Sequence, residues 1–136
     1  MKISITKNKP LLVVLIGILA LALAACARTA PIYSVSNAPV VVSSGNHNAT
    51  DVKNAILRAG SSLGWQIREV EPGHIVGVLS IRTHTAEVDI YYNAQTYSIS
   101  YRDSNNLNYD GTNIHSNYNG WVQNLDNAIK NQLLSV

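Results

Sequence analysis

The chain has 136 residues, with 10 lysines and arginines, 8 aspartates and glutamates, and one cysteine. Three of the lysines lie in the first nine residues; without them, residues 26–136 keep seven basic and eight acidic side chains, a formal net charge of −1. A nucleic-acid-binding protein needs clustered basic charge, which this balance does not supply. A single cysteine also excludes an internal disulfide, so packing must hold the fold together.

The first 25 residues have the layout of a signal peptide. Lys2, Lys7 and Lys9 precede residues 11–25, an apolar run without a charge. These 15 residues would form about 22 Å of helix, which is shorter than the ~30 Å hydrocarbon core of a bilayer. We therefore expect residues 1–25 to be a cleaved signal peptide and not a membrane span.

The end of this segment reads Leu23, Ala24, Ala25, Cys26. These residues resemble the lipobox of bacterial lipoproteins, in which cleavage leaves the cysteine as the first residue with diacylglycerol on its sulfur. The resemblance implies that Cys26 carries a covalent lipid with palmitate-like acyl chains, which anchors the protein in a membrane. Apart from this lipid, we expect no cofactor. The alternative is an ordinary secretory signal with an incidental cysteine.

The residue after the cysteine influences which membrane a Gram-negative lipoprotein is anchored in. In Gram-negative lipoproteins an aspartate at this position commonly retains the protein in the inner membrane. Ala27 occupies it here. For a Gram-negative source, the resemblance therefore implies an outer-membrane lipoprotein that faces the periplasm.

Residues 26–50 are rich in serine, alanine, proline, valine and asparagine, and Arg28 is their only charged residue. Because they lack a helical period, we expect a lipidated flexible tether, within which residues 40–42 are a candidate edge strand. A flexible chain of this length spans on the order of 27 Å. The folded part is then a single small domain, residues 51–136, which is large enough to fold alone.

A first helix is predicted from about residue 50 to residue 63. Asn48, Ala49 and Thr50 match a glycosylation sequon, but we interpret them as a helix start with Thr50 as the N-cap. Apolar residues recur at helical spacing at Val52, Ile56, Ala59 and Leu63. Gly64 then supplies a stop.

Four strands follow, each with one apolar and one polar face. The first begins at residue 65 and is closed by Pro72 and Gly73, which fit the central positions of a type II turn. The others cover residues 74–82, 85–92 and 96–102. This alternation predicts an antiparallel meander that is covered on one side only.

The apolar pattern also predicts how these strands pair. A two-residue turn at Thr83 and His84 would pair Ile81 with Ala86, Leu79 with Val88 and Gly77 with Ile90. All these partners share one face, and a slip by one residue would destroy the match. On the polar face, Glu87 would lie opposite Arg102.

A C-terminal helix is predicted from an apolar stripe, with Lys130 near its negative end. The stripe consists of Trp121, Leu125, Ala128, Ile129 and Leu133. The predicted fold is α+β: a two-layer α-β-β-β-β-α domain with a four-stranded antiparallel meander and two helices on one face.

Between the last strand and this helix lies an 18-residue connection, residues 103–120, with six asparagines. Connections this long are uncommon in compact domains and are often functional or disordered. We expect either a packed surface loop or a recognition surface of amides and tyrosines. The candidate interaction residues are Asn105, Asn106, Tyr109, Asp110, Asn113, His115 and Tyr118.

Several residues in and around this connection follow a recognisable pattern: Tyr97, Ser98, Ile99, Tyr101, Ser104, Asn106, Leu107, Tyr109, Ile114, His115, Asn117, Tyr118, Asn119, Trp121, Val122, Asn124 and Leu125. With these residues the chain is similar to a family of small bacterial envelope proteins, generally lipoproteins or secreted domains without an assigned function. The similarity covers roughly residues 65–130. It implies an envelope domain and assigns no catalytic residue.

A catalytic or metal site competes with a simpler interpretation, in which the same polar residues are a solvated surface. Asp103, Asp110 and His115 would form an acid/base set if they converged, but no nucleophile motif accompanies them. The four histidines lack the close spacing of a zinc site, and no closing glutamate completes a calcium loop after Asp103. We therefore expect no catalytic residue and no metal. We expect Trp121 to lie in the core because it belongs to the apolar stripe of the C-terminal helix. Tyr109 and Tyr118 are better candidates for an aromatic glycan platform.

The sequence thus predicts a membrane-anchored envelope lipoprotein without enzymatic activity. We expect it to bind another envelope protein, either through residues 103–120 or by adding a strand to an open sheet edge. The alternative function is binding of glycans or peptidoglycan fragments through the Asn- and Tyr-rich connection. No nucleic acid is expected as a partner.

Overall fold

The computed structural model describes residues 28–136. The predicted signal peptide, residues 1–25, and the predicted lipidation site Cys26 lie outside the described residues. Within the described part of the chain, no helix combines the length and the apolar character needed to span a membrane.

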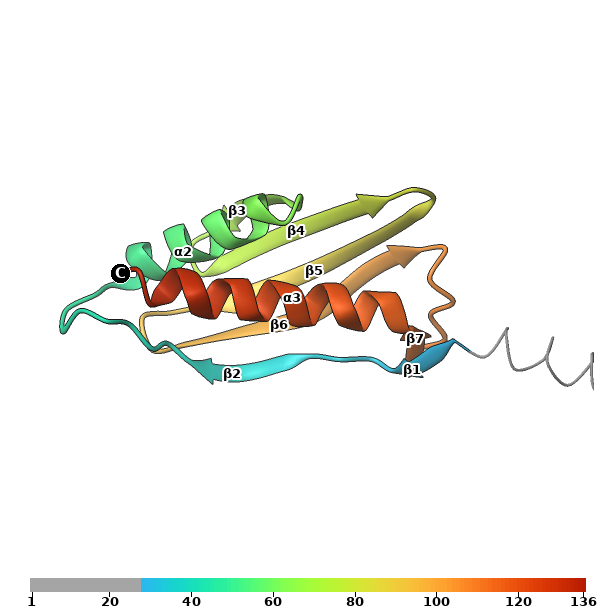
Figure 1. The fold of residues 1–136 in the computed structure, drawn as a ribbon, viewed down its shortest axis with the longest axis horizontal. Helices are drawn as coiled ribbons and strands as arrows, with labels where there is room; N and C mark the ends of the chain where they lie inside the picture. The colour runs from blue at the N-terminus through green and yellow to red at the C-terminus, as the bar shows by residue number, and fades with distance from the viewer. Residues whose placement is uncertain (1–27) are drawn as a thin grey trace, which may run out of the picture.

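Residues 28–136 form two helices that pack on one face of an antiparallel sheet (Figure 1). The elements are β1 (Thr29–Pro31), β2 (Val35–Pro39), α2 (Ala49–Ser62), β3 (Gln66–Glu71), β4 (His74–Ile81), β5 (His84–Tyr92), β6 (Thr96–Asn105), β7 (Asn113–His115) and α3 (Ser116–Leu133). The main sheet has the order β2-β6-β5-β4-β3, and β1 pairs with β7 in a small second sheet. The predicted α+β class is confirmed, with one more strand in the main sheet than the predicted four.

The core lies between the helices and the sheet. As the alternation predicts, Val88, Ile90 and Ile99 on the apolar face of β5 and β6 are completely buried. The helices contribute buried residues at helical spacing: Val52, Ala55, Ile56 and Ala59 from α2, and Val122, Leu125, Ile129 and Leu133 from α3. Burying one such branched side chain contributes about 1.5–3 kcal/mol, so this interface is the main source of stability.

Helix α2 begins earlier than predicted, and Thr50 is not its cap. Asn48 is the N-cap: its Oδ1 accepts a hydrogen bond from Asp51 N at 3.0 Å, and Asp51 Oδ2 accepts one from Asn48 N at 2.9 Å. This reciprocal pair is a capping box, which satisfies two backbone donors at once. The interpretation of residues 48–50 as a helix start is confirmed. Gly64 follows the helix with a φ of 86°, as expected of a stop.

The β4–β5 turn contains Arg82 and Thr83 and not the predicted Thr83 and His84. Ile81 therefore pairs with His84, and the predicted partners of Leu79 and Gly77 each shift by two residues, to Ala86 and Val88. A shift of two keeps every side chain on its predicted face. Arg82 takes a φ of 56°, a conformation rare outside glycine and asparagine, so the sequence carries no sign of this turn.

The pairing of β5 with β6 is interrupted by a bulge. Val88 lies opposite Tyr101 and Glu87 opposite Asp103, so Arg102 is the extra residue and not the partner of Glu87. The Arg102 side chain still reaches the predicted carboxylate: its Nε lies 3.7 Å from Glu87 Oε2.

Residues 28–50 do not form the predicted tether. Strand β1 pairs with β7, and β2 forms the edge of the main sheet beside β6, with Val35 opposite Ile99. Val35 is buried, and Ile32 and Tyr33 pack against the core. The predicted domain start at residue 51 is therefore wrong, because the fold includes the chain from Thr29 onwards. The edge strand also lies before residues 40–42.

Candidate binding surfaces

The predicted 18-residue connection is much shorter in the structure. Strand β6 continues to Asn105, β7 occupies Asn113–His115, and α3 begins at Ser116. Only residues 106–112 therefore form a loop between strands. His115 caps α3, with its Nδ1 accepting a hydrogen bond from Asn117 N at 3.1 Å. The sequence does not reveal this arrangement because the partner of β7 lies in the segment predicted to be a tether.

The loop residues are held by contacts with their neighbours. The carbonyl oxygen of Asn106 accepts a hydrogen bond from His84 Nδ1 at 2.6 Å, and Asn106 Nδ2 donates to Thr83 Oγ1 at 2.8 Å. Asp110 Oδ1 accepts from Asn113 N at 2.7 Å and from Thr112 N at 2.9 Å. These backbone donors lower the pKa of Asp110. Asp110 therefore shapes its own turn.

The two tyrosines predicted for the loop, Tyr109 and Tyr118, differ in exposure. Tyr109 remains 39% exposed and stacks on Tyr101, with ring centroids 4.0 Å apart. Tyr118 is completely buried in α3, so its prediction as a surface residue is wrong. Its hydroxyl has no hydrogen-bond partner, and burial raises its pKa. Of the remaining candidates, Asn105 is exposed at the end of β6, and Asn113 and His115 lie in β7.

The three residues considered for acid/base chemistry each make local contacts. Asp103 Oδ1 accepts a hydrogen bond from Ser104 N at 2.8 Å, while Asp110 and His115 hold the backbone contacts given above. Among residues 28–136, no hydrogen bond or ion pair joins these three side chains. The same part of the chain contains no group of three or more His, Cys, Asp or Glu side chains placed to hold a metal ion.

The histidines are less scattered than the sequence suggested. His84 and His115 lie with ring centroids 6.2 Å apart, and His84 lies 6.4 Å from Trp121. His74 is on the polar face of the sheet, where its Nε2 contacts Asp89 Oδ1 at 2.6 Å and its ring stacks on Tyr91. His47 Nε2 donates to Ala94 O at 2.6 Å.

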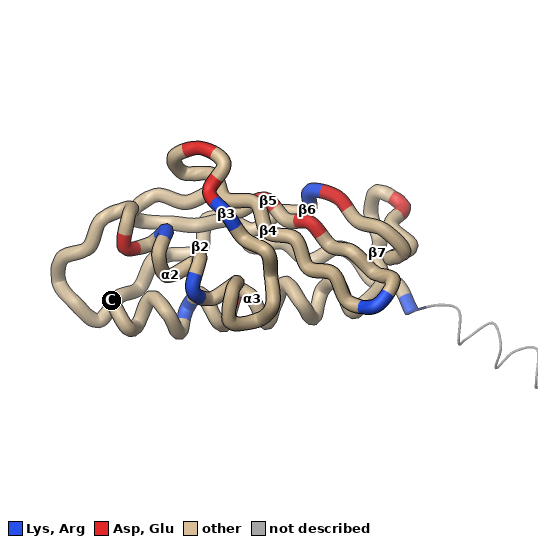
Figure 2. Tube along the Cα trace, turned by 90° about the horizontal axis from the view of Figure 1, so that it is seen from above, with Lys and Arg blue, Asp and Glu red and all other residues tan. Residues whose placement is uncertain are grey.

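The polar face of the sheet carries a chain of charged side chains. Arg102 Nη1 donates to Asp89 Oδ1 at 2.9 Å, on the same carboxylate oxygen that His74 contacts. Figure 2 shows the charged positions of β3, β5 and β6 along the side of the molecule opposite α3. His74, Asp89 and Arg102 satisfy one another, as expected of a solvated sheet face.

Helix α2 ends at Ser62 and does not cover the end of β4. A small hollow of about 80 Å³ lies there, lined by Leu63, Trp65, Leu79, Ile81, Trp121 and Asn124. Trp121 is only partly buried and borders this hollow, whereas the sequence placed it in the core. Trp65, at 4% exposed, is the tryptophan that the core contains.

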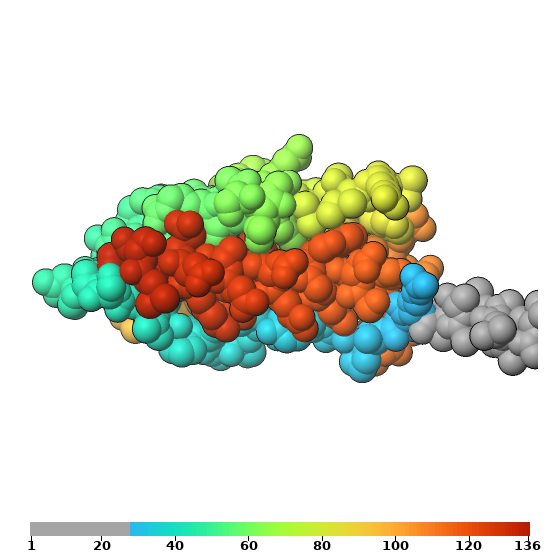
Figure 3. Space-filling model, in the orientation of Figure 1, coloured from blue at the N-terminus to red at the C-terminus, as the bar shows by residue number. Residues whose placement is uncertain are grey.

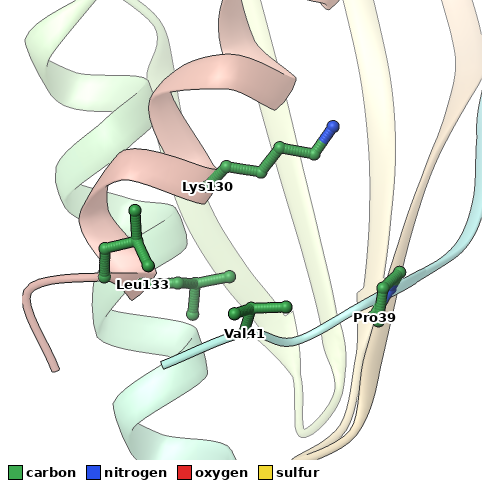
Figure 4. Close-up of a pocket in the computed structure, with 5 residues that line it drawn as sticks. Pro39, Val41, Lys130 and Leu133 are labelled. Carbon is green, nitrogen blue, oxygen red and sulfur yellow. The ribbon is translucent and has the colours of Figure 1, made fainter. Parts of the chain in front are cut away.

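A larger apolar pocket lies at the opposite end of the molecule. It has a volume of about 240 Å³ and is lined by Pro39, Val41, Lys130, Leu133 and Leu134; we call it the distal pocket. Leu133 and Val41 face the same space between α3 and the segment after β2 (Figure 4). Val41 is 59% and Leu134 54% exposed. Figure 3 shows this end of the molecule, with the first described residues at the other end.

The distal pocket has no direct signal in the sequence. Its walls come from residues 39–41 and 130–134, which are far apart in the chain and adjoin only because β2 belongs to the sheet. The run of three valines at residues 40–42 is the one local hint, and its composition indicates a strand and not a pocket wall.

No protein-family model matches this chain, and comparisons with curated proteins and with solved structures found no match.

Proposed function

We propose that this protein is a lipid-anchored envelope lipoprotein whose domain binds another envelope protein and carries out no catalysis. The anchor part of the proposal is supported by the basic and apolar residues before Leu23 and by the lipobox-like residues 23–26. With Ala27 after the cysteine, a Gram-negative cell would place the protein on the periplasmic side of the outer membrane.

The observation that carries the binding part is the distal pocket. Soluble domains rarely leave large apolar side chains exposed together, and such patches commonly mark interaction sites. Val41 and Leu134 are more than half exposed beside a 240 Å³ hollow. An aromatic or aliphatic side chain of a partner would fill such a hollow and act as the central anchor of an interface.

The position of the pocket fits an anchored protein. Strand β1, which begins three residues after the proposed lipid attachment, lies at the other end of the domain (Figure 1). A helix of 18 residues, α3, spans about 27 Å between the two ends. The pocket would therefore be presented away from the membrane, where a second envelope protein can reach it.

Photo-crosslinking in living cells tests this proposal. A photoreactive residue placed at Val41 or Leu134 is expected to give a discrete protein adduct, which mass spectrometry can identify. The same residue at Gln123, an exposed position of α3 outside the pocket, is the control and is expected to give none. Absence of a protein adduct at both pocket positions would contradict the proposal.

Binding of glycans or peptidoglycan fragments is the second candidate, and one observation favours it. Tyr109 is backed by Tyr101 at 4.0 Å and remains 39% exposed, which suits an aromatic platform for a sugar ring. Crosslinking from Asn106, Tyr109 and Asn113 separates the two candidates. Adducts with cell-wall glycan at these positions, and none with protein at the distal pocket, would favour glycan binding.

A further inference from the structure

The end of the domain nearest to Arg28 forms one connected surface. Arg28 O accepts a hydrogen bond from Ser116 N at 3.0 Å, and His115 N donates to Leu107 O at 2.8 Å. Through His84 and Asn106 the same contacts continue to the β4–β5 turn. We call residues 81–84, 106–112 and 115–121 the anchored end.

We infer that the anchored end rests directly on the membrane that holds Cys26, with the long axis of the domain pointing away from it. This inference rests on the proposed lipid anchor and adds an orientation to it. The occupant of the surface is thus the lipid bilayer and not a protein.

The chain between the proposed lipid and the folded domain is too short to separate the two. Only one residue, Ala27, separates Cys26 from Arg28. Two residues span at most about 7 Å. The predicted tether would have allowed on the order of 27 Å, but β1 already pairs with β7 at Thr29. Arg28 and the start of α3, which it contacts, are therefore held close to the headgroup region.

The exposed side chains of the anchored end are of types that suit contact with a lipid bilayer. Ile81 is 37% and Tyr109 39% exposed at this end. Trp121 is partly exposed, with its ring 6.4 Å from that of His84, and it lines the same hollow as Ile81. Tryptophan and tyrosine are enriched at the level of lipid headgroups, where their rings have one apolar and one polar side. Arg82 is exposed in the β4–β5 turn and suits anionic lipid phosphates.

The acidic side chain of Asp110 lies on the same surface, so the contact is not a polybasic one. Its carboxylate is held in its own turn by backbone donors, as described above. The attraction to the bilayer would therefore come from apolar and aromatic side chains. It would add to the membrane affinity that the acyl chains supply and would not replace it.

A quenching experiment tests the orientation. The full lipidated protein is purified from membranes and placed in vesicles of phosphatidylethanolamine and phosphatidylglycerol that contain doxyl-labelled lipid. A fluorophore is attached to the cysteine introduced by Ile81→Cys, by Tyr109→Cys or, as the control, by Val41→Cys. Cys26 is the natural chain's one cysteine, so a lipidated protein takes the label only at the introduced site. Circular dichroism shows that each variant is folded.

The expected result is loss of fluorescence at Ile81 and Tyr109 and an unquenched signal at Val41, which lies beside the C-terminal end of α3, in the distal pocket. Equal quenching at all three positions means that the domain lies flat, and no quenching at Ile81 and Tyr109 means that it stands off the membrane; either overturns the inference. Flotation of the same vesicles tests the anchor separately. A protein that floats but is not quenched disproves only the orientation, whereas one that does not float disproves the anchor as well.

Discussion

The hydroxyl of Tyr97 donates a 2.6 Å hydrogen bond to the carboxylate of Asp126, which connects β6 with α3 through the core. Tyr97 is 1% and Asp126 4% exposed. The other carboxylate oxygen of Asp126 accepts a hydrogen bond from Lys130 Nζ at 2.8 Å. A buried charge is tolerated here because both of its oxygens have donors.

We expect Asp126→Ala to lower the free energy of unfolding by about 2 kcal/mol, because it leaves the Tyr97 hydroxyl buried without an acceptor. Loss of the Lys130 contact adds little, since that side chain is 54% exposed and regains water. Urea denaturation followed by circular dichroism measures the change. Asn127→Ala, at an exposed neighbouring position, is the control and should change stability by less than about 0.5 kcal/mol.

Two buried tyrosines make stability depend on alkaline pH. Burial raises the pKa of Tyr97 and of Tyr118 above the ordinary value of 10.0, and the hydrogen bond to Asp126 raises that of Tyr97 further. Up to pH 10 both the folded and the unfolded protein keep these protons. Above it the unfolded chain releases them and the folded one does not, so the free energy of unfolding falls as the pH rises.

The expected slope is up to about 1.4 kcal/mol per pH unit for each of the two tyrosines. Denaturation curves between pH 9 and pH 11 measure it. Tyr97→Phe should remove the contribution of Tyr97 and make the curve less steep. A free energy of unfolding that does not change from pH 9 to pH 11 would refute this explanation.

The capping box of α2 gives a prediction with a matched control in the same turn. Asn48→Ala should lower the free energy of unfolding by about 1 kcal/mol, because the backbone N–H of Asp51 loses its acceptor. Thr50→Ala, at the position that the sequence suggested as the cap, should change it by less than about 0.5 kcal/mol. Thermal denaturation of both variants decides between the two caps, and a larger loss for Thr50→Ala would contradict the structure.

Gly77 lies where the sheet leaves little room for a side chain. A Cβ there would lie 3.2 Å from Trp65 Cε3 and 3.3 Å from Val88 Cγ2. We expect Gly77→Ala to destabilise the protein by about 1–3 kcal/mol through overpacking. A Cβ added at Gly45 would meet no atom within 4 Å, so Gly45→Ala should be nearly neutral. Equal denaturation midpoints for the two variants would contradict the tight packing around Gly77.

The role of β1 and β2 is tested by shortening the chain. A protein that starts at residue 51 lacks both strands and exposes the edge of β6, together with the core surface that Val35 and Tyr33 cover. We expect it to aggregate or to lose its cooperative thermal transition, whereas one that starts at residue 28 should keep it. A shortened chain with an unchanged transition would restore the interpretation of residues 26–50 as a tether.

Most of the fold could be predicted because its signals are local. The spacing of Val52 and Ile56 and the alternation of Val88 and Ile90 each lie within one element. Strands β1 and β7 have three residues each and pair across more than eighty positions of the chain, so neither has a pattern of its own. The β4–β5 turn was misplaced because Arg82 adopts a positive φ that its residue type does not announce.

The candidate surfaces depended on packing and were therefore harder to predict. The sequence predicts Tyr118 to be a loop residue because neither β7 nor the first turn of α3 has a recognisable pattern. Trp121 borders a hollow because α2 is shorter than α3, and this follows from where both helices lie. The distal pocket joins Val41 and Leu134, whose adjacency depends on β2 being a strand of the sheet.

The most direct test of the proposed function is the mass of the mature protein's N-terminus. Protein isolated from cell membranes is digested with trypsin, and the N-terminal peptide is expected to be residues 26–28, cut after Arg28. Its mass should equal that peptide plus a diacylglycerol, with or without a third acyl chain, because Cys26 is then the modified first residue. An unmodified Cys26, or a chain that still contains residues 1–25, would contradict the anchor and the orientation inferred from it.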